Sequence, residues 1–231
     1  MVTLTAAAPR RRRERPGRRL IGHDRTLGAR FVAGADEAGR GCLAGPLVAA
    51  GVLLDLELIG PREVRALGLL DDSKRHDEAS RERLYDAVLA VAARVTVIVR
   101  PAATIDRVGL HRTNLTALHD ALTEVAVPGA ICLSDGFAVG EVAGCETRAL
   151  LRGDSTSAAI AAASIVAKVS RDRMMHRLAR DYPQWGFDRH VGYSTPDHRA
   201  AIAEHGITPL HRRSFASVAY RQLTLDEPAG T

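Results

Sequence analysis

The chain has 231 residues, a formal net charge of +5 and apolar residues at 46% of its positions. This length suits one large domain with a sizeable core, or one domain with a small appendage. No apolar run is long enough to cross a membrane as a helix, and arginines follow residues 1–8 instead of preceding them, the reverse of a secretory signal. We therefore expect a cytoplasmic protein that does not engage membranes.

The cysteines and the basic residues indicate which structural sites and which partners this protein can have. Cys42, Cys132 and Cys145 are not clustered at a metal-ligand spacing, which argues against a disulfide framework and a zinc site. The positive charge favours a nucleic-acid partner. Seven arginines lie between Arg10 and Arg19, in a segment without apolar periodicity. Residues 1–19 are predicted to be a disordered tail, either a solvated spectator or a non-specific phosphate-binding arm.

Strands and helices alternate along the rest of the chain. Two apolar strands come first, at residues 31–35 and 47–54, and are close enough in sequence to pair antiparallel. The patterns that follow predict a helix at 77–93, a strand at 94–100, a helix at 113–125, strands at 130–133 and 146–151, a long helix at 156–180, and short helices at 196–205 and 214–223. This order predicts a mixed α/β sheet with helices on its faces.

Two adjacent carboxylates, Asp36 and Glu37, follow the first strand and lead into the turn Gly39-Arg40-Gly41. An unpaired carboxylate is costly to bury, so a cation is expected beside the pair. The glycines allow backbone N–H groups to approach a ligand closely. This combination indicates phosphoryl chemistry.

Two further predicted strands end close to an acid, at Asp135 and at Asp154. Ligands of open α/β sheets collect at strand ends, so the four carboxylates are expected to converge. Oxygen ligands suit Mg²⁺ or Mn²⁺, and two such ions about 3.5–4 Å apart activate water and stabilise the leaving oxygen in phosphodiester cleavage. The alternative is that Asp135-Gly136 and Gly153-Asp154-Ser155 are ordinary turns, in which Asp and Gly are common.

The chain resembles the bacterial ribonuclease HII family from about residue 20 to 220. The resemblance rests on seven motifs in the family's order, which are Asp36-Glu37-Ala-Gly39-Arg40-Gly41, Asp72-Ser73-Lys74, Ser134-Asp135-Gly136, Gly153-Asp154-Ser155, residues 162–172, His190-Val-Gly192-Tyr193 and His211-Arg-Arg-Ser214-Phe215. It implies a ribonuclease H-like fold, with a mixed five-stranded sheet flanked by helices and a C-terminal helical extension at about 183–223. The catalytic domain would then span 20–223, with a flexible end at 224–231.

The resemblance also implies an activity, which is endonucleolytic cleavage of RNA in RNA–DNA hybrids and on the 5′ side of single ribonucleotides in duplex DNA. Such cleavage leaves a 3′-hydroxyl and a 5′-phosphate. The protein is expected to act as a monomer on these nucleic acids, with two Mg²⁺ or Mn²⁺ ions during catalysis. The metal-binding acids of the family correspond to Asp36, Glu37, Asp135 and Asp154.

The substrate-binding residues implied by the resemblance surround these acids. The backbone of Gly39, Arg40 and Gly41 would enclose the ribose, whose 2′-hydroxyl distinguishes RNA from DNA. Tyr193 would stack at the ribo–deoxyribo junction. Lys74 and Lys168, the two lysines of the chain, would contact phosphates, and Ser164 and Arg171 would help to position the substrate backbone.

Some nearby residues are interpreted as structural. Asp172 lies inside the long predicted helix close to basic residues, and His190 and His211 are interpreted as packed histidines. The chain departs from the family pattern at Cys42, at Arg152 and at Val191, where a lysine is common. None of these changes removes a metal ligand, although the change at Val191 is expected to weaken binding to the DNA strand.

Two other functions remain open from the sequence. One is a DNA junction nuclease of the same superfamily, which would lack Tyr193 and the Gly-Arg-Gly turn. The other is a non-catalytic nucleic-acid-binding protein, which would not need four intact carboxylates.

Overall fold

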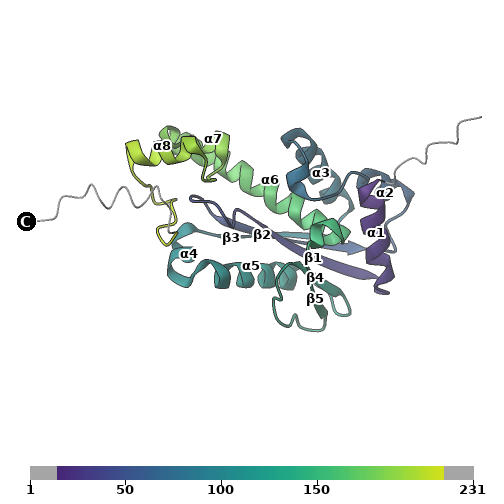
Figure 1. The fold of residues 1–231 in the computed structure, drawn as a ribbon. Helices are drawn as coiled ribbons and strands as arrows, with labels where there is room; N and C mark the ends of the chain where they lie inside the picture. Colours follow the sequence, from purple (N-terminus) through teal and green to yellow (C-terminus); the bar gives the residue numbers. More distant parts are fainter. Residues whose placement is uncertain (1–14, 216–231) are drawn as a thin grey trace, which may run out of the picture.

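The computed structural model describes residues 15–215. The predicted flexible end at 224–231, residues 1–14 of the predicted tail and most of the predicted helix at 214–223 lie outside these described residues. The structure confirms the predicted architecture, which is one mixed five-stranded sheet with helices on both faces (Figure 1).

The five strands lie in the order β3-β2-β1-β4-β5. The sheet is antiparallel on one side of β1, where β1 pairs with β2 and β2 with β3, and parallel on the other, where β1 pairs with β4 and β4 with β5. The strands are β1 (Phe31–Ala38), β2 (Leu47–Asp55), β3 (Arg94–Arg100), β4 (Ile131–Asp135) and β5 (Glu146–Leu150). Strand β1 is therefore central, and its carboxyl end lies beside that of β4.

Each face of the sheet has its own hydrophobic cluster. Alternate residues of a strand point to opposite faces, so Val32 of β1 packs under α6 (Ala158–Asp181), whereas Ala33 and Ala35 pack against α5 (Leu110–Val125). Figure 1 shows α6 and α5 on the two sides of the sheet. Helix α3 (Glu78–Val91) covers the α6 face, and α4 (Ala102–Val108) the α5 face.

Glycines in the two central strands let these helices approach the sheet closely. A Cβ at Gly34 of β1 would lie 2.2 Å from the carbonyl carbon of Ala159 in α6. On the other face, a Cβ at Gly51 of β2 would lie 2.3 Å from the carbonyl oxygen of Ala121 in α5. Backbone touches backbone at both points, so the sheet fixes both helices at short range.

The structure corrects the predicted tail. Helix α1 (Pro16–Thr26) begins inside the segment predicted to be disordered, and its Leu20 and Ile21 are buried. Pro16 occupies the first helical turn, where the missing N–H of proline is harmless. The buried carboxylate of Asp24 accepts a hydrogen bond from the Ala159 N–H at 3.0 Å, so α1 caps the start of α6.

The remaining differences concern short elements and boundaries. The prediction omitted α2 (Pro61–Ala66), α4, α7 (Phe187–His190) and the 3₁₀ turns η1 (Ser73–Arg75), η2 (Gly153–Ser155) and η3 (Pro183–Trp185). The helix predicted at 113–125 begins earlier, at Leu110, and the helix predicted at 196–205 is α8 (Pro196–His205). No helix in residues 15–215 is long and apolar enough to span a membrane.

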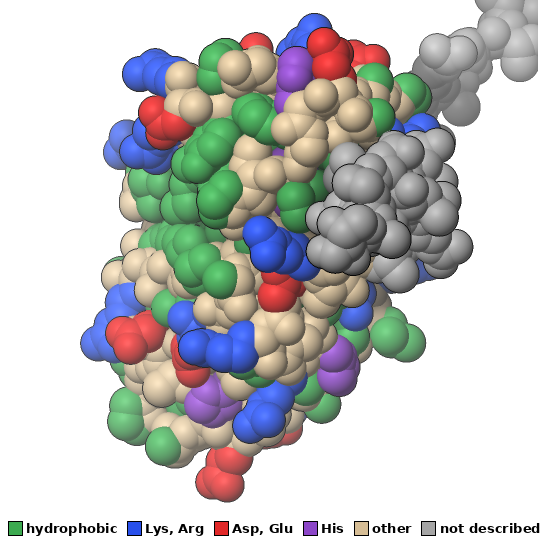
Figure 2. All heavy atoms as spheres, turned by 90° about the vertical axis from the view of Figure 1, so that its left-hand side faces the viewer, with side chains coloured by type: hydrophobic (Ala, Val, Ile, Leu, Met, Phe, Trp, Pro, Cys, Tyr) green, Lys and Arg blue, Asp and Glu red, His purple; other side chains and the backbone are tan. Residues whose placement is uncertain are grey.

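The C-terminal extension packs on the far end of α6. Its helices α7 and α8 enclose Phe187, which is fully buried beside Ala44 and Met175. Between this extension and the β3–α4 edge lies a groove lined by apolar residues that include Pro46, Val99, Pro101, Leu178 and Leu210. Figure 2 shows the hydrophobic side chains gathered on this face. The extension thus contacts the loop that follows β1 as well as α6.

We predict that Gly34→Ala lowers the free energy of unfolding by about 3 kcal/mol, because the added methyl group meets the backbone of α6 and no side chain can move aside. Gly22→Ala is the matched control. No described atom lies within 4 Å of a Cβ at this exposed position of α1, so helix propensity should raise stability there by about 0.5–1 kcal/mol. Urea denaturation of both variants measures the difference, and equal stabilities would contradict the close approach.

Candidate active site

Asp36 and Glu37, at the carboxyl end of β1, point to opposite faces of the sheet. Asp36 lies on the α6 side, is 7% exposed, and accepts a hydrogen bond from the Glu37 N–H at 2.7 Å. Burial raises the pKa of Asp36 well above its ordinary value, the negative charges of Glu37 and Asp135 raise it further, and a hydrogen bond from Ser164 opposes the rise. A buried carboxylate between two others requires a cation for its stable ionisation.

Glu37 lies on the α5 side, beside Asn114. Burial raises the pKa of Glu37, and the neighbouring Asn114 amide and Arg40 guanidinium oppose that rise. The Glu37 Oε2 atom is buried and has no hydrogen-bond partner within 3.5 Å among the described residues. An orphaned carboxylate oxygen at this depth fits a ligand that the carboxylate would hold.

Asn114 was missed in the sequence analysis. It is fully buried on the face of α5 that also carries Leu118 and Ala121. The next residue, Leu115, is only partly buried. A polar residue four positions before a core leucine is the signal that could have revealed Asn114.

Asp135 and Asp154 complete the acidic cluster. Asp135 ends β4, beside β1, and its charge acts on Asp36, Glu37 and Asp154. Arg152 adopts a left-handed backbone with φ of 54°, and the turn directs the Gly153 N–H at Asp135 Oδ1, 2.6 Å away. Burial raises the pKa of Asp154 in η2, and the charges of Asp135 and Asp72 add to the rise. The four predicted acids therefore share one electrostatic environment.

The donor set of this cluster fits a hard divalent cation. Its ligands would be carboxylate oxygens, which suit Mg²⁺ or Mn²⁺. Within residues 15–215, however, no group of three or more His, Cys, Asp or Glu side chains is arranged so that it could already hold one ion. Asp36 and Asp135 each have an oxygen engaged by a backbone N–H. The second oxygen of each of these carboxylates would be available to an ion.

Lys74 and the Gly-Arg-Gly turn lie beside the acids. Lys74 is exposed, and its charge lowers the pKa of both Glu37 and Asp154. Gly41 is exposed, and no described atom lies within 4 Å of the place where its Cβ would be. Gly39, in contrast, has a φ of +84°, and a Cβ there would lie 1.9 Å from Arg171 Nε. A ligand can therefore approach the turn at Gly41, whereas the Arg171 side chain packs against it at Gly39.

The structure gives Arg171 a role inside the protein. Its side chain is fully buried. The guanidinium donates to the carbonyl of Pro46 at 2.9 Å, that of Val191 at 2.9 Å and that of Ala44 at 3.1 Å. Arg171 therefore joins the loop after β1 to the segment before Tyr193, and its part in positioning the substrate stays a prediction.

Ser164 is also buried, at 5% exposure, and its hydroxyl oxygen lies 2.9 Å from Ser73 Oγ, within hydrogen-bond distance. Because it also hydrogen-bonds Asp36, Ser164 connects that acid with the 3₁₀ turn η1. Its contact with substrate stays a prediction.

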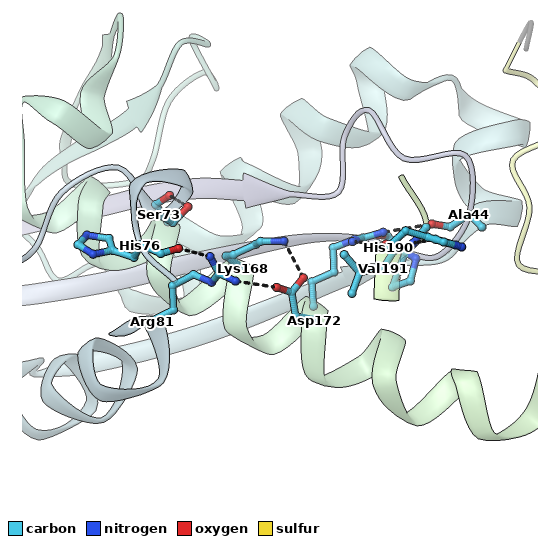
Figure 3. A network of polar contacts seen from close by, with 12 residues as sticks. Ala44, Ser73, His76, Arg81, Lys168, Asp172, His190 and Val191 are labelled. Carbon is cyan, nitrogen blue, oxygen red and sulfur yellow. Dashed lines mark hydrogen bonds and ion pairs between the residues drawn. The ribbon is translucent and has the colours of Figure 1, made fainter. Parts of the chain in front are cut away.

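Asp172 holds the other lysine in place, as shown in Figure 3. Lys168 Nζ lies 2.8 Å from Asp172 Oδ1, and Arg81 approaches the other carboxylate oxygen at 3.9 Å. The Lys168 ammonium also lies 5.4 Å from the centre of the Tyr193 ring, which is 39% exposed. The contacts agree with the structural interpretation of Asp172, and they place the Lys168 charge against Tyr193.

Three comparisons with known proteins agree with this geometry. Residues 33–218 match the model of the ribonuclease HII family. A ribonuclease HII from Parafrankia is 44% identical over 214 residues, covering 91% of this chain and 85% of the relative. The ribonuclease H2 structure from Pyrococcus horikoshii superposes with a TM-score of 0.72 at 25% identity, over 84% of this chain and 96% of that one.

A fourth likeness shows the fold alone. The structure of Bst ribonuclease HIII in complex with Mn²⁺ has a TM-score of 0.64 at 22% identity, and covers 89% of this chain and 73% of that one. The fold and the acids at the end of its central strand define a ribonuclease H-like endonuclease. More narrowly, the chain belongs to the ribonuclease HII family, which is dependent on divalent metal ions and acts on RNA–DNA hybrids.

We predict that Arg171→Met lowers the free energy of unfolding by about 3 kcal/mol or more, because three buried carbonyls lose their donor. Arg171→Lys should restore little of this loss, since one ammonium cannot reproduce the planar fork. Chemical denaturation measures both variants. If Arg171 instead contacted a phosphate, Arg171→Lys would keep that contact. Arg171→Met would then reduce the slope of log binding constant against log salt concentration by about 1.

We also predict that metal-free Asp36→Asn is more stable than the wild type at pH 8. Folding raises the pKa of Asp36, so its contribution is most favourable below the ordinary carboxyl pKa and is lost as the pH rises through the raised value. Mg²⁺ or Mn²⁺ should raise the melting temperature of the wild type but not of Asp36→Asn.

Asp77→Asn is the control for this comparison. Asp77 is an exposed cap of α3 whose pKa is lowered by Ser80, so its charge stabilises the fold. This variant should keep the full response to metal. An equal metal response in Asp36→Asn would show that Asp36 is not a ligand.

Proposed function

We propose that this enzyme cuts duplex DNA on the 5′ side of single embedded ribonucleotides, and that Asp36, Glu37, Asp135 and Asp154 hold its divalent ions. The proposal rests on one observation, namely that the loop after the acidic strand is fastened to the segment that carries Tyr193. The Leu43 N–H donates to the Gly192 carbonyl at 2.9 Å, and Arg171 bonds to carbonyls of both segments. The acids and the proposed sugar-reading groups are thus parts of one rigid unit.

The surroundings of the acids suit a nucleic-acid backbone. Gly41 leaves its amide accessible, so a ribose can approach where a side chain would stand in its way. The 2′-hydroxyl both donates and accepts hydrogen bonds, which allows backbone groups of this turn to recognise it. The exposed face of Tyr193 can stack on the sugar or base at the ribo–deoxyribo junction. Lys74 supplies a positive charge to the phosphate beside the acids.

The reaction is the hydrolysis of one phosphodiester bond. Water attacks the phosphorus, the bond to the upstream 3′-oxygen breaks, and the products carry a 3′-hydroxyl and a 5′-phosphate. Bound divalent ions, which we propose to be two Mg²⁺ or Mn²⁺, supply activation of the water and stabilisation of the leaving oxygen. The protein side chains orient these ions, and Lys74 offsets charge on the phosphate. Specificity comes from the turn and Tyr193, because they contact the sugar rather than the phosphate.

A DNA duplex with one ribonucleotide tests this proposal. With Mg²⁺ or Mn²⁺, we expect a single nick on the 5′ side of the ribonucleotide, and no nick with chelator or in the all-DNA duplex. Asp154→Asn should reduce kcat at least about 100-fold because it removes one ligand of the ions. Mapping the product ends on a sequencing gel identifies the cleaved bond.

Two outcomes would contradict the proposal. Cutting of the all-DNA duplex or of a DNA junction would support the alternative hypothesis of a DNA junction nuclease. Cutting of an RNA–DNA hybrid without nicking at the single ribonucleotide would restrict the enzyme to hybrids.

A further inference from the structure

Three histidines are buried together in the C-terminal extension, away from the acids. His190 and His198 stack with ring centres 4.3 Å apart, and Nε2 of His198 lies 3.1 Å from Nε2 of His211. The fully buried ring of Phe187 contacts all three. Exposure is 8% for His190, zero for His198 and 2% for His211. His190 and His211, which the sequence pattern indicates to be packed residues, are both buried.

Backbone groups at both ends fix where the protons of this cluster lie. The Thr208 N–H donates to Nδ1 of His211 at 2.9 Å, so that nitrogen is an acceptor and the proton of His211 is on Nε2. His211 Nε2–H then donates to Nε2 of His198. The proton of His198 is therefore on Nδ1, and it donates to the Tyr193 carbonyl, 2.9 Å away. A carbonyl can only accept, so only one order of donors and acceptors is possible along these hydrogen bonds. We call this chain, from the Thr208 N–H through His211 and His198 to the Tyr193 carbonyl, the relay.

His190 is fixed in the same way. The Gly192 N–H donates to its Nδ1 at 3.2 Å, and its Nε2–H donates to the Trp185 carbonyl at 2.7 Å. All three rings are thus neutral in this arrangement. Burial lowers the pKa of both His198 and His211 to about 4, which preserves these donors and acceptors at neutral pH.

The relay ends on the residue that carries the exposed aromatic ring near the active site. Around Tyr193 the backbone is unusual, with Val191 at a φ of 42° and Gly192 at +85°. Arg171 holds the Val191 carbonyl, and the Leu43 N–H holds that of Gly192. The Tyr193 carbonyl accepts from the Thr195 N–H at 2.8 Å and from His198.

We propose that His198, oriented by His211 and Thr208, is a positioning residue that sets the Tyr193 ring for recognition of the ribonucleotide. His198 holds the main chain of Tyr193 at its carbonyl, and Arg171 holds the carbonyl of Val191 two residues earlier. Because His198 is fully buried, it would act on the ring only through this main chain. This inference rests on the proposed role of Tyr193 in nicking at single ribonucleotides.

A double-mutant cycle between His198 and Tyr193 tests the proposal. His198→Phe keeps the ring volume and removes the donor, whereas His198→Asn keeps an N–H at the position of Nδ1. We expect His198→Phe to lower kcat/KM on the single-ribonucleotide duplex by about 10- to 100-fold, and His198→Asn to stay within about threefold of the wild type. In a Tyr193→Ala background, His198→Phe should cause no further loss, because its effect passes through the missing ring. An equal loss in both backgrounds would overturn the proposal.

NMR of the wild-type protein tests the relay directly. It requires no activity measurement, and it does not depend on whether a variant folds. Histidine ¹⁵N spectra at pH 7 should show His198 as the Nδ1–H tautomer and His190 and His211 as Nε2–H tautomers. An Nε2–H tautomer at His198 would overturn the proposal.

The ring resonances of Tyr193, assigned by their loss in Tyr193→Ala, provide the second readout. Their chemical shifts should change in His198→Phe and remain those of the wild type in His198→Asn. Unchanged chemical shifts of the Tyr193 ring in His198→Phe would also overturn the proposal. These spectra separate the two hypotheses. If the wild type fails to nick at single ribonucleotides while the spectra are as expected, the proposed function is wrong and the relay stands.

Discussion

The burial of the Asp36 carboxylate in the central strand is the constraint on which the rest of the structure depends. Glycine at position 34 brings α6 against β1, and this contact removes water from Asp36. The apolar layers then have to include polar groups at the strand end, which Ser164 of α6 supplies on one face and Asn114 of α5 on the other. Neither group neutralises the charge. A cation does so most directly, and the same cation would perform the chemistry.

The family motifs contain residues of two kinds, and the structure separates them. Lys74, Gly41 and Tyr193 are exposed, and we propose that they meet the nucleic acid beside Asp36. Arg171 and Gly39 face inward, and so does Arg212, which donates to the carbonyls of Gly45 and Arg40. Two buried arginines thus hold the loop after β1 by its carbonyl groups. A substitution among them would change activity through the shape of this loop, without any lost contact to substrate.

The sequence predicts the sheet and the gathering of the four acids at its strand ends, because apolar runs that end in carboxylates are local patterns. It did not predict the role of Arg171, since arginine is rarely buried and its three carbonyl partners come from distant parts of the chain. Asn114 was missed because a single polar residue in an apolar row is easily assigned to the surface. Helix α1 was missed because its composition favours disorder. Its order comes from tertiary contacts, such as that of Asp24 with α6.

The position of β1 in the sheet has a consequence for the synthesis of the chain. Its antiparallel partner β2 follows at once, so that hairpin can form as soon as it leaves the ribosome. Its parallel partner β4, the acid of η2 and the α6 residues that enclose Asp36 are all made much later. Closing so long a loop is the slow step of such a topology. A nascent chain therefore carries only two of the four clustered acids, Asp36 and Glu37, until β4 and η2 have been made.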